Sequence, residues 1–168
     1  MKTVFLIITL LISTTLFAQD EFTRAKQGSE APDFNYTTLD GSSHSLSELD
    51  GKVVWITFFA TWCGPCRKEL PHLEKEVYEK YKDNPGFKLL VIGREHNSAE
   101  VEKFMKDTGH NLPFIPDPKR EIFDKYAAQN IPRNFLIDQT GKIVTSSVGF
   151  TEEDFNAKVQ KLEELLND

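Results

Sequence analysis

The chain has 168 residues, of which 39% are hydrophobic and 27% charged, a composition typical of one soluble globular domain and not of a disordered, collagen-like or multi-span membrane protein. Its formal net charge of -6 argues against a nucleic-acid-binding surface, and its 2 cysteines are too few for a disulfide framework. At this size folding buries roughly 70% of the unfolded surface, so one hydrophobic core is sufficient.

The first segment, residues 1–18, has the pattern of a secretory signal peptide. Lys2 gives it a positive start, and the run from Val4 to Ile12 is apolar apart from one threonine. We predict cleavage after Ala18 and export to a periplasmic, oxidising compartment. An uncleaved membrane anchor is the less favoured alternative, because the apolar run is shorter than the ~20 residues of a spanning helix.

The rest of the chain is predicted to form a lead-in, residues 19–28, and one domain, residues 29–168. Apolar and β-branched runs predict strands at 34–38, 43–45, 53–59, 87–92, 134–138 and 142–148. Helical periodicity predicts helices at 63–82, 98–106, within 117–128, and at 151–166, with Ser98 and Thr151 as N-caps. This order is typical of an α/β fold, with a mixed sheet and helices on both faces.

Two cysteines lie where the buried strand at 53–59 meets the following helix, in the sequence Cys63-Gly64-Pro65-Cys66. Free N–H groups and the helix dipole at a helix start stabilise a thiolate, so Cys63 is predicted to be the reactive, exposed sulfur. Cys66 falls one turn further along, on the apolar face, and is predicted to be shielded. This asymmetry predicts that Cys63 attacks a disulfide and that Cys66 resolves the mixed disulfide.

Other roles for a cysteine pair fit the sequence less well. A zinc site needs two further ligands, but there is no second cysteine pair and the 4 histidines are scattered. Haem attachment requires histidine directly after the second cysteine, where this chain has Arg67. A structural disulfide closing so short a loop would stabilise the fold little. A redox site is therefore the favoured interpretation, and neither a metal nor a cofactor is predicted.

Residues 58–66, with the sequence FFATWCGPC, resemble the active-site motif of the thioredoxin superfamily and of its exported TlpA/ResA-like branch. Residues 130–138 are similar to the family's cis-proline loop and following strand, and the likeness covers nearly all of residues 29–167. The resemblance implies a thioredoxin-like fold, with a mixed central sheet flanked by helices, an N-terminal β-hairpin and a central βα insertion. It also implies a thiol–disulfide oxidoreductase of protein disulfides or dithiols, with a membrane thiol-transfer protein as electron donor.

The resemblance also assigns roles around the cysteine pair. The Ile131-Pro132 bond is expected to be cis, with its loop facing the cysteines and pairing with an extended substrate. Trp62 and Pro65 are expected to shape and cover the substrate site. Arg133 departs from the family pattern, which has small hydroxyl residues here. It is expected either to contact an acidic partner or the thiolate, or to be a solvated loop residue.

Glu69 is the predicted proton acceptor for the resolving cysteine. It lies three residues after Cys66 and shares a helix side with it. Many thioredoxins have a buried aspartate six residues before the first cysteine, where this chain has Thr57. The ResA-like pattern instead has a glutamate at the position of Glu69, which implies general-base catalysis. The alternative is an ordinary exposed helix glutamate.

A polar segment, residues 94–96, follows the strand at 87–92. Ligands bind beyond the carboxyl ends of strands in open sheets, so this segment is a candidate for the site. A simple polar loop is the favoured alternative.

The favoured function is reduction of protein disulfides after export, for example in cytochrome c maturation or disulfide repair. Gly64-Pro65 matches the reducing thioredoxins, which disfavours a dithiol oxidase. Peroxide-reducing relatives have proline and threonine seven and three residues before the reactive cysteine, where this chain has Ile56 and Ala60. The remaining alternative is a redox-silent binding module, which would keep its function without the cysteines.

Overall fold

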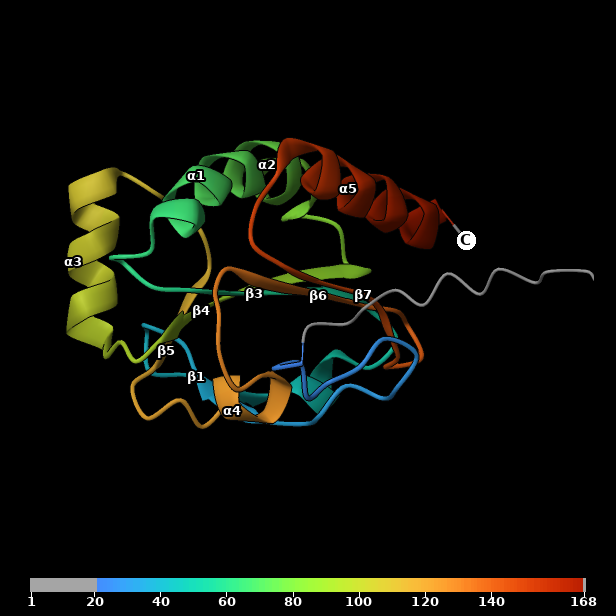
Figure 1. Cartoon of the computed structure of the whole chain (residues 1–168), viewed down its shortest axis with the longest axis horizontal. Helices are drawn as coiled ribbons and strands as arrows, with labels where there is room; N and C mark the ends of the chain where they lie inside the picture. The colour runs from blue at the N-terminus through green and yellow to red at the C-terminus, as the bar shows by residue number, and fades with distance from the viewer. Residues whose placement is uncertain (1–20, 168) are drawn as a thin grey trace, which may run out of the picture.

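A computed structural model describes residues 21–167 of the chain (Figure 1), so the predicted signal peptide and its cleavage site lie outside the described residues. The centre is a five-stranded mixed sheet with the strand order β5-β4-β3-β6-β7. Its strands are β3 (Val53–Phe59), β4 (Phe87–Arg94), β5 (Phe114–Asp117), β6 (Arg133–Ile137) and β7 (Ile143–Val148). β3 pairs parallel with β4 and antiparallel with β6, so the cysteine motif follows the central strand.

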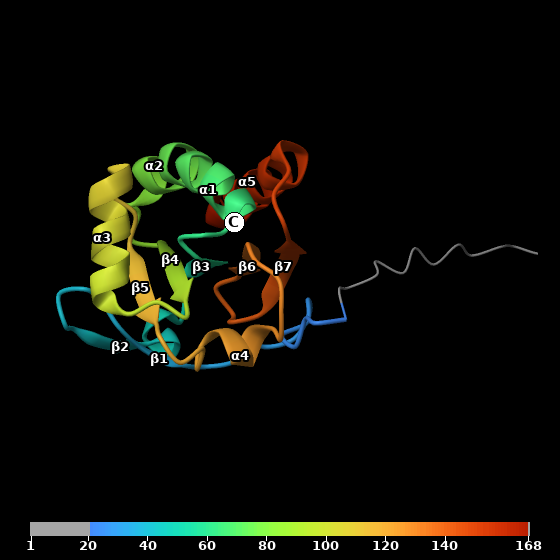
Figure 2. The same cartoon turned by 60° about the vertical axis from the view of Figure 1, so that its left-hand side comes forward.

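Helices lie on both faces of the sheet, as the sequence predicts. One face carries α1 (Gly64–His72), η2 (Leu73–Tyr78), α2 (Glu79–Tyr81), α3 (Ser98–Thr108) and α5 (Glu152–Asn167). The other carries α4 (Phe123–Tyr126), η1 (Leu46–Leu49) and the predicted hairpin, β1 (Asn35–Thr37) with β2 (Ser43–Ser45). Figure 2 shows these two layers on opposite sides of the sheet. Among the described residues, no helix combines the length and the apolar character needed to cross a membrane.

The central strand divides the core in two. All seven residues of β3 are buried, and alternate side chains point to opposite faces. Val53, Trp55 and Phe59 pack in the cluster beneath α1 and α5, whereas the alternate residues pack against α4 and the hairpin. Thr57 therefore points toward α1, and its hydroxyl lies beneath the helix that carries the cysteines.

The segment between β4 and β6 differs from its prediction. The sequence predicts a helix within 117–128 and no strand before it, but the structure has β5 and only the short α4 (Phe123–Tyr126). Pro116 is tolerated because β5 is an edge strand, where a missing N–H need not break a ladder. The Asp117 carboxylate accepts hydrogen bonds from the amides of Ile122 and Phe123, at 3.2 and 2.9 Å, which delays the start of α4.

The N-cap of α3 is one residue earlier than predicted. Asn97, and not Ser98, is the cap, and it forms a reciprocal capping box with Glu100. Asn97 Oδ1 accepts from the Glu100 amide at 3.0 Å, and Glu100 Oε2 accepts from the Asn97 amide at 2.8 Å. The predicted cap of α5 is confirmed, because Thr151 Oγ1 accepts from the Asp154 amide at 3.2 Å.

The helix predicted at 63–82 is helical along its length but changes its hydrogen-bond register. α1 contains Pro71, which lacks the N–H that would bond to the Arg67 carbonyl. The π-helical segment η2 begins two residues later, at Leu73.

The described part of the lead-in is packed, whereas the sequence suggests a loose segment. The amides of Arg24 and Ala25 both donate to the Tyr126 carbonyl at 3.0 Å. Ala25 is 3% exposed, and Thr23 forms a bridge with Ala127. These contacts attach the lead-in to the end of α4.

Candidate active site

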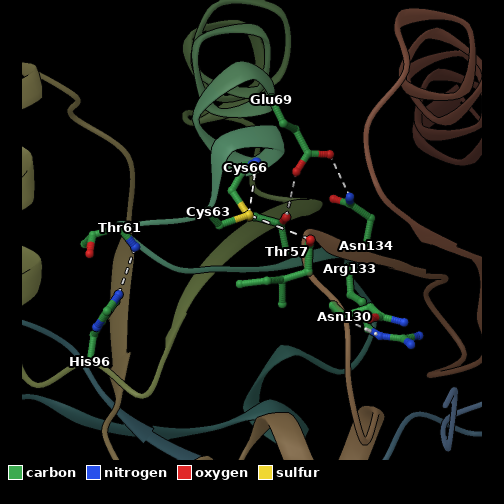
Figure 3. The surroundings of a disulfide bond; sticks show 10 residues. Thr57, Thr61, Cys63, Cys66, Glu69, His96, Asn130, Arg133 and Asn134 are labelled. Carbon is green, nitrogen blue, oxygen red and sulfur yellow. Dashed lines mark hydrogen bonds between the residues drawn. A yellow bond between two sulfur atoms is a disulfide. The ribbon is translucent and has the colours of Figure 1, made fainter.

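Cys63 and Cys66 form a disulfide at the start of α1 (Figure 3). Cys63 is the N-cap, and its Sγ accepts a hydrogen bond from the Cys66 amide at 3.2 Å. Pro65 lies in the first turn, where its missing N–H costs little. An amide aimed at Cys63 Sγ, together with the helix dipole, favours a thiolate on Cys63 once the pair is reduced.

Only one of the two sulfur-bearing residues lines an open cavity. Cys66 is 0% exposed and Cys63 only 4%, so the prediction of an exposed Cys63 is too strong. Cys63 nevertheless lines a cavity of about 570 Å³, together with Trp62, Pro65 and Ile131, whereas Cys66 does not. The side chain of Trp62 is 66% exposed. A substrate therefore has access to Cys63 through this cavity.

The proline loop faces the disulfide. The Ile131-Pro132 bond is cis, as the resemblance implies. The Ile131 carbonyl oxygen lies 3.7 Å from Cys63 Sγ. The Pro132 carbonyl accepts from the Gly149 amide at 2.9 Å, which attaches the loop to the chain after β7.

Arg133 fits neither expectation for it. Its side chain is 1% exposed, so it is neither a solvated loop residue nor available to a partner. Its Nε donates to the carbonyls of Gln129 and Asn130, at 2.7 and 3.1 Å, and Nη1 donates to Thr23 Oγ1 at 2.7 Å. The buried Arg133 side chain thus fixes the backbone of residues 129–130, just before the proline loop. The sequence could not show this, because the acceptors are backbone carbonyls and a lead-in residue.

Glu69 is buried, so it is not the ordinary exposed helix residue of the alternative. It is 1% exposed; its Oε1 accepts from Asn134 Nδ2 at 2.7 Å and its Oε2 from Thr57 Oγ1 at 3.3 Å (Figure 3). Burial raises the pKa of Glu69 to about 7, although hydrogen bonds from Asn134 and Thr57 and the charge of Lys158 act to lower it. Its carboxyl group can therefore exchange a proton near neutral pH.

Two residues near Glu69 are missing from the sequence prediction. Asn134 lies opposite Thr57 in the β3–β6 pairing, and its Oδ1 accepts from Trp55 Nε1 at 2.9 Å. This bond directs the Asn134 amide nitrogen to Glu69. Lys158 on α5 is 2% exposed and donates to Ser147 Oγ and an aspartate of its own helix. The signal that could have identified Asn134 is its position opposite Thr57 in the β3–β6 pairing. The sequence alone does not fix that register.

The polar segment 94–96 also reaches the site. His96 is 6% exposed, and its Nε2 accepts a hydrogen bond from the Thr61 amide at 2.8 Å. Thr61 belongs to the turn that leads into Cys63. His96 thus fixes that turn, and Arg94 lines the same cavity as Cys63. The segment is therefore more than a polar loop.

Comparison with known proteins agrees with this geometry. The model of the Redoxin family matches residues 26–166. The chain belongs to the Redoxin family. It is 35% identical over 136 residues to a thiol-disulfide oxidoreductase ResA of Bacillus cereus, covering 80% of this chain and 78% of that one.

Solved structures show the same fold. A candidate protein disulfide isomerase from Bacteroides thetaiotaomicron is 44% identical with a TM-score of 0.84, over 88% of this chain and 94% of that one. A candidate thiol:disulfide interchange protein DsbE from Chlorobium tepidum is 30% identical with a TM-score of 0.71, over 84% and 98%. This Redoxin family member thus has the predicted thioredoxin-like fold and is a thiol–disulfide oxidoreductase of the ResA/DsbE type, whose close Cys63–Cys66 pair is the redox centre.

Proposed function

We propose that the protein is an exported reductase of protein disulfides. The observation that carries this proposal is the placement of the two sulfurs: Cys63 Sγ accepts an amide hydrogen bond at a helix N-terminus and its residue lines an open cavity, while Cys66 is buried behind it. A substrate sulfur can reach Cys63 but not Cys66. Cys66 therefore reacts only in the intramolecular step.

The reaction consists of two thiol–disulfide exchanges. In the reduced protein, the Cys63 thiolate attacks one sulfur of a substrate disulfide, forms a mixed disulfide and releases the other substrate sulfur as a thiolate, which takes up a proton. The Cys66 thiolate then attacks Cys63 Sγ and releases the second substrate sulfur. Two electrons pass to the substrate, and the Cys63–Cys66 disulfide seen here remains.

Glu69 is proposed as the group that takes the Cys66 proton before the second exchange. It lies one turn from Cys66 on α1, and its pKa of about 7 suits a base that works near neutral pH. We propose that the substrate chain binds to Trp62, Pro65 and the Ile131-Pro132 loop. Trp62, Pro65 and Ile131 line the cavity, and the loop contacts Cys63 through the Ile131 carbonyl. The role of Arg133 is to position that loop.

The cellular setting is proposed from the first 28 residues and from the chemistry. Residues 1–18 would direct export and be removed after Ala18; residues 19–28 would form the lead-in and residues 29–168 the domain. A reductase in an oxidising, periplasmic compartment needs a supply of electrons, and a membrane thiol-transfer protein is the proposed donor. Clients would include apocytochromes before haem attachment or proteins with incorrect disulfides.

Trapping of the mixed disulfide tests the proposed order of attack. Cys66→Ser leaves the attacking sulfur but removes the resolving one, so it should accumulate a covalent adduct with a disulfide-bonded client protein. Cys63→Ser should form none. The adduct is measured by non-reducing electrophoresis and mass spectrometry. Adducts through Cys66 in the Cys63→Ser variant would contradict the assignment, and function retained in the double serine variant would favour a redox-silent module.

The opposite direction, disulfide formation, is tested with the same client. The reduced protein should reduce an oxidised client, with the Gly64-Pro65 dipeptide supporting this direction. Faster transfer of the disulfide from the oxidised protein to a reduced client would identify a dithiol oxidase.

A further inference from the structure

The cavity beside Cys63 carries charge that the exchange chemistry does not use. Of the described residues that line its volume of about 570 Å³, only Arg94 and Arg120 are charged, and no acidic residue lines it. The whole chain has a formal net charge of -6. Both arginines are ion-paired within the chain, Arg94 with Glu95, and Arg120 with Glu95 and Asp124.

The two guanidinium groups are held in place by one buried ring. Phe123 is 0% exposed, and the Cζ atoms of Arg94 and Arg120 lie 5.0 and 5.2 Å from its ring centroid. Arg120 Nη2 also donates to the Ala128 carbonyl at 2.8 Å. Within the described part of the chain, the Nε atoms of both arginines are without a hydrogen-bond partner. Because both Nε atoms are buried, a ligand in the cavity can reach only the terminal Nη groups, whose positions the Phe123 ring fixes.

An internal carboxylate already occupies the position between the two arginines. Glu95 Oε2 lies 3.2 Å from Arg94 Nη2, and Glu95 Oε1 lies 3.5 Å from Arg120 Nη1. The Glu95 side chain is 44% exposed, so its carboxylate is in contact with solvent. The arrangement shows that one carboxylate can span both guanidinium groups, with one oxygen facing each arginine.

Backbone strain is concentrated at the same place. In the described chain, the non-glycine residues with left-handed backbone are Glu95, Arg120 and Asn130, with φ of 63°, 61° and 65°. Arg120 and Asn130 line the cavity, and Glu95 contacts both arginines. Such conformations cost free energy, persist where the surrounding structure holds them, and cluster at active sites and ligand-binding segments.

We propose that Arg94 and Arg120 bind a carboxylate of the substrate protein, so that preferred clients carry aspartate or glutamate close to the cysteine that Cys63 attacks. This inference rests on the proposed reductase function and adds a substrate preference to it. The substrate carboxylate takes the place of that of Glu95. A carboxylate in that place pairs with the two guanidinium groups, whereas a basic side chain there is repelled by them.

Reduction of matched peptides tests this preference. Peptides that differ only in having glutamate, glutamine or lysine next to one cysteine of a disulfide are reduced by the protein, and kcat/KM is compared. We expect the glutamate peptide to react about two- to fivefold faster than the glutamine peptide, the upper part of the range of a partly exposed ion pair, and the lysine peptide to react slowest. The ratio of kcat/KM for the glutamate peptide to that for the glutamine peptide should fall toward one in 1 M salt, where the screening length is only about 3 Å.

Variants of the arginines separate a specific site from general electrostatics. Arg94→Gln should bring the glutamate-to-glutamine ratio toward one, and Arg94→Lys should keep most of it. Glu95→Gln should raise the ratio, because it removes the competing carboxylate. Lys103→Gln is the matched control: its side chain is 74% exposed on α3 outside the cavity, and it changes the net charge equally. It should leave the ratio unchanged.

The outcomes are distinct. A ratio that depends on Arg94 but not on Lys103 supports the carboxylate site. A wild-type ratio of one, or a ratio that Arg94→Gln leaves intact, overturns it even though the peptides are reduced. If none of the peptides is reduced, the proposed reductase function itself fails.

Discussion

Glu69 provides a titration near neutral pH on which the second exchange of the proposed mechanism depends. Glu69→Gln keeps the size of the side chain and one acceptor oxygen, but it cannot accept a proton. We expect it to slow release of the substrate from the mixed disulfide by about 100-fold, the lower end for general-base catalysis. The wild-type release rate should rise with pH through about 7, the pKa of this carboxyl, and the variant should lose this rise.

Single-turnover kinetics with a mixed disulfide on Cys63 measure this step. Glu79→Gln is a suitable control, because it makes the same chemical change at an exposed position of α2. Equal pH profiles for wild type and Glu69→Gln would show that another group takes the Cys66 proton.

The same carboxyl group should make stability depend on pH. Its pKa is raised from 4.5 to about 7 in the folded protein, so the folded state holds the proton more tightly than the unfolded state. The stabilisation is fully present below pH 4.5 and is lost as pH rises through about 7. Relative to Glu69→Gln, the wild-type free energy of unfolding should fall by about 3 kcal/mol over this interval. Urea denaturation of both oxidised proteins at several pH values measures it; parallel curves would contradict it.

Residue roles were predictable where they follow from position on a single element. Cys63 and Cys66 are assigned by the start of a helix and its apolar face, and the structure places both there. The burial of Glu69 and Arg133 was not predictable, because it depends on partners far away in the sequence. Glu69 meets Asn134 from β6, and Arg133 meets Thr23 from the lead-in.

At the scale of elements, α3 gives the clearest test of local structure. Asn97→Ala removes the acceptor of the Glu100 amide and breaks the capping box. We expect a loss of about 1 kcal/mol in stability, and a decrease in Tm of roughly 2–4 °C for a domain of this size. Thermal denaturation measures it.

Ser98→Ala is the matched control, since this exposed residue follows the cap. It should change Tm little. A larger effect for Ser98→Ala than for Asn97→Ala would show that the cap is the residue predicted from sequence.

Element boundaries were predictable where periodicity was strong and unpredictable where prolines interrupted it. β3 spans the predicted 53–59, because a continuous apolar, β-branched run is typical of a strand buried on both faces. β5 was missed because prolines surround it and it is only four residues long. Its position is stabilised by parallel pairing with β4, a tertiary contact that local sequence does not show.

At the scale of the whole molecule, the cavity beside Cys63 is assembled from segments far apart in the chain. Residues of the cysteine turn, Arg94 at the end of β4, Arg120 before α4 and residues 128–131 all line it. The sequence resemblance predicted that the cysteines face the proline loop. It could not predict the arginine pair, because these residues are brought together by the ring of Phe123 and the carboxylate of Glu95.

The reduction potential of the Cys63–Cys66 couple tests most directly whether this oxidoreductase works as a reductase. The protein is equilibrated with thiol buffers of known potential, and the fraction of disulfide is measured by alkylation and mass spectrometry. We predict a value of about -270 mV, near that of thioredoxin, at which the reduced pair gives up electrons to most client disulfides. A value of about -120 mV, near that of the strong periplasmic oxidants, would contradict the account and identify a donor of disulfides.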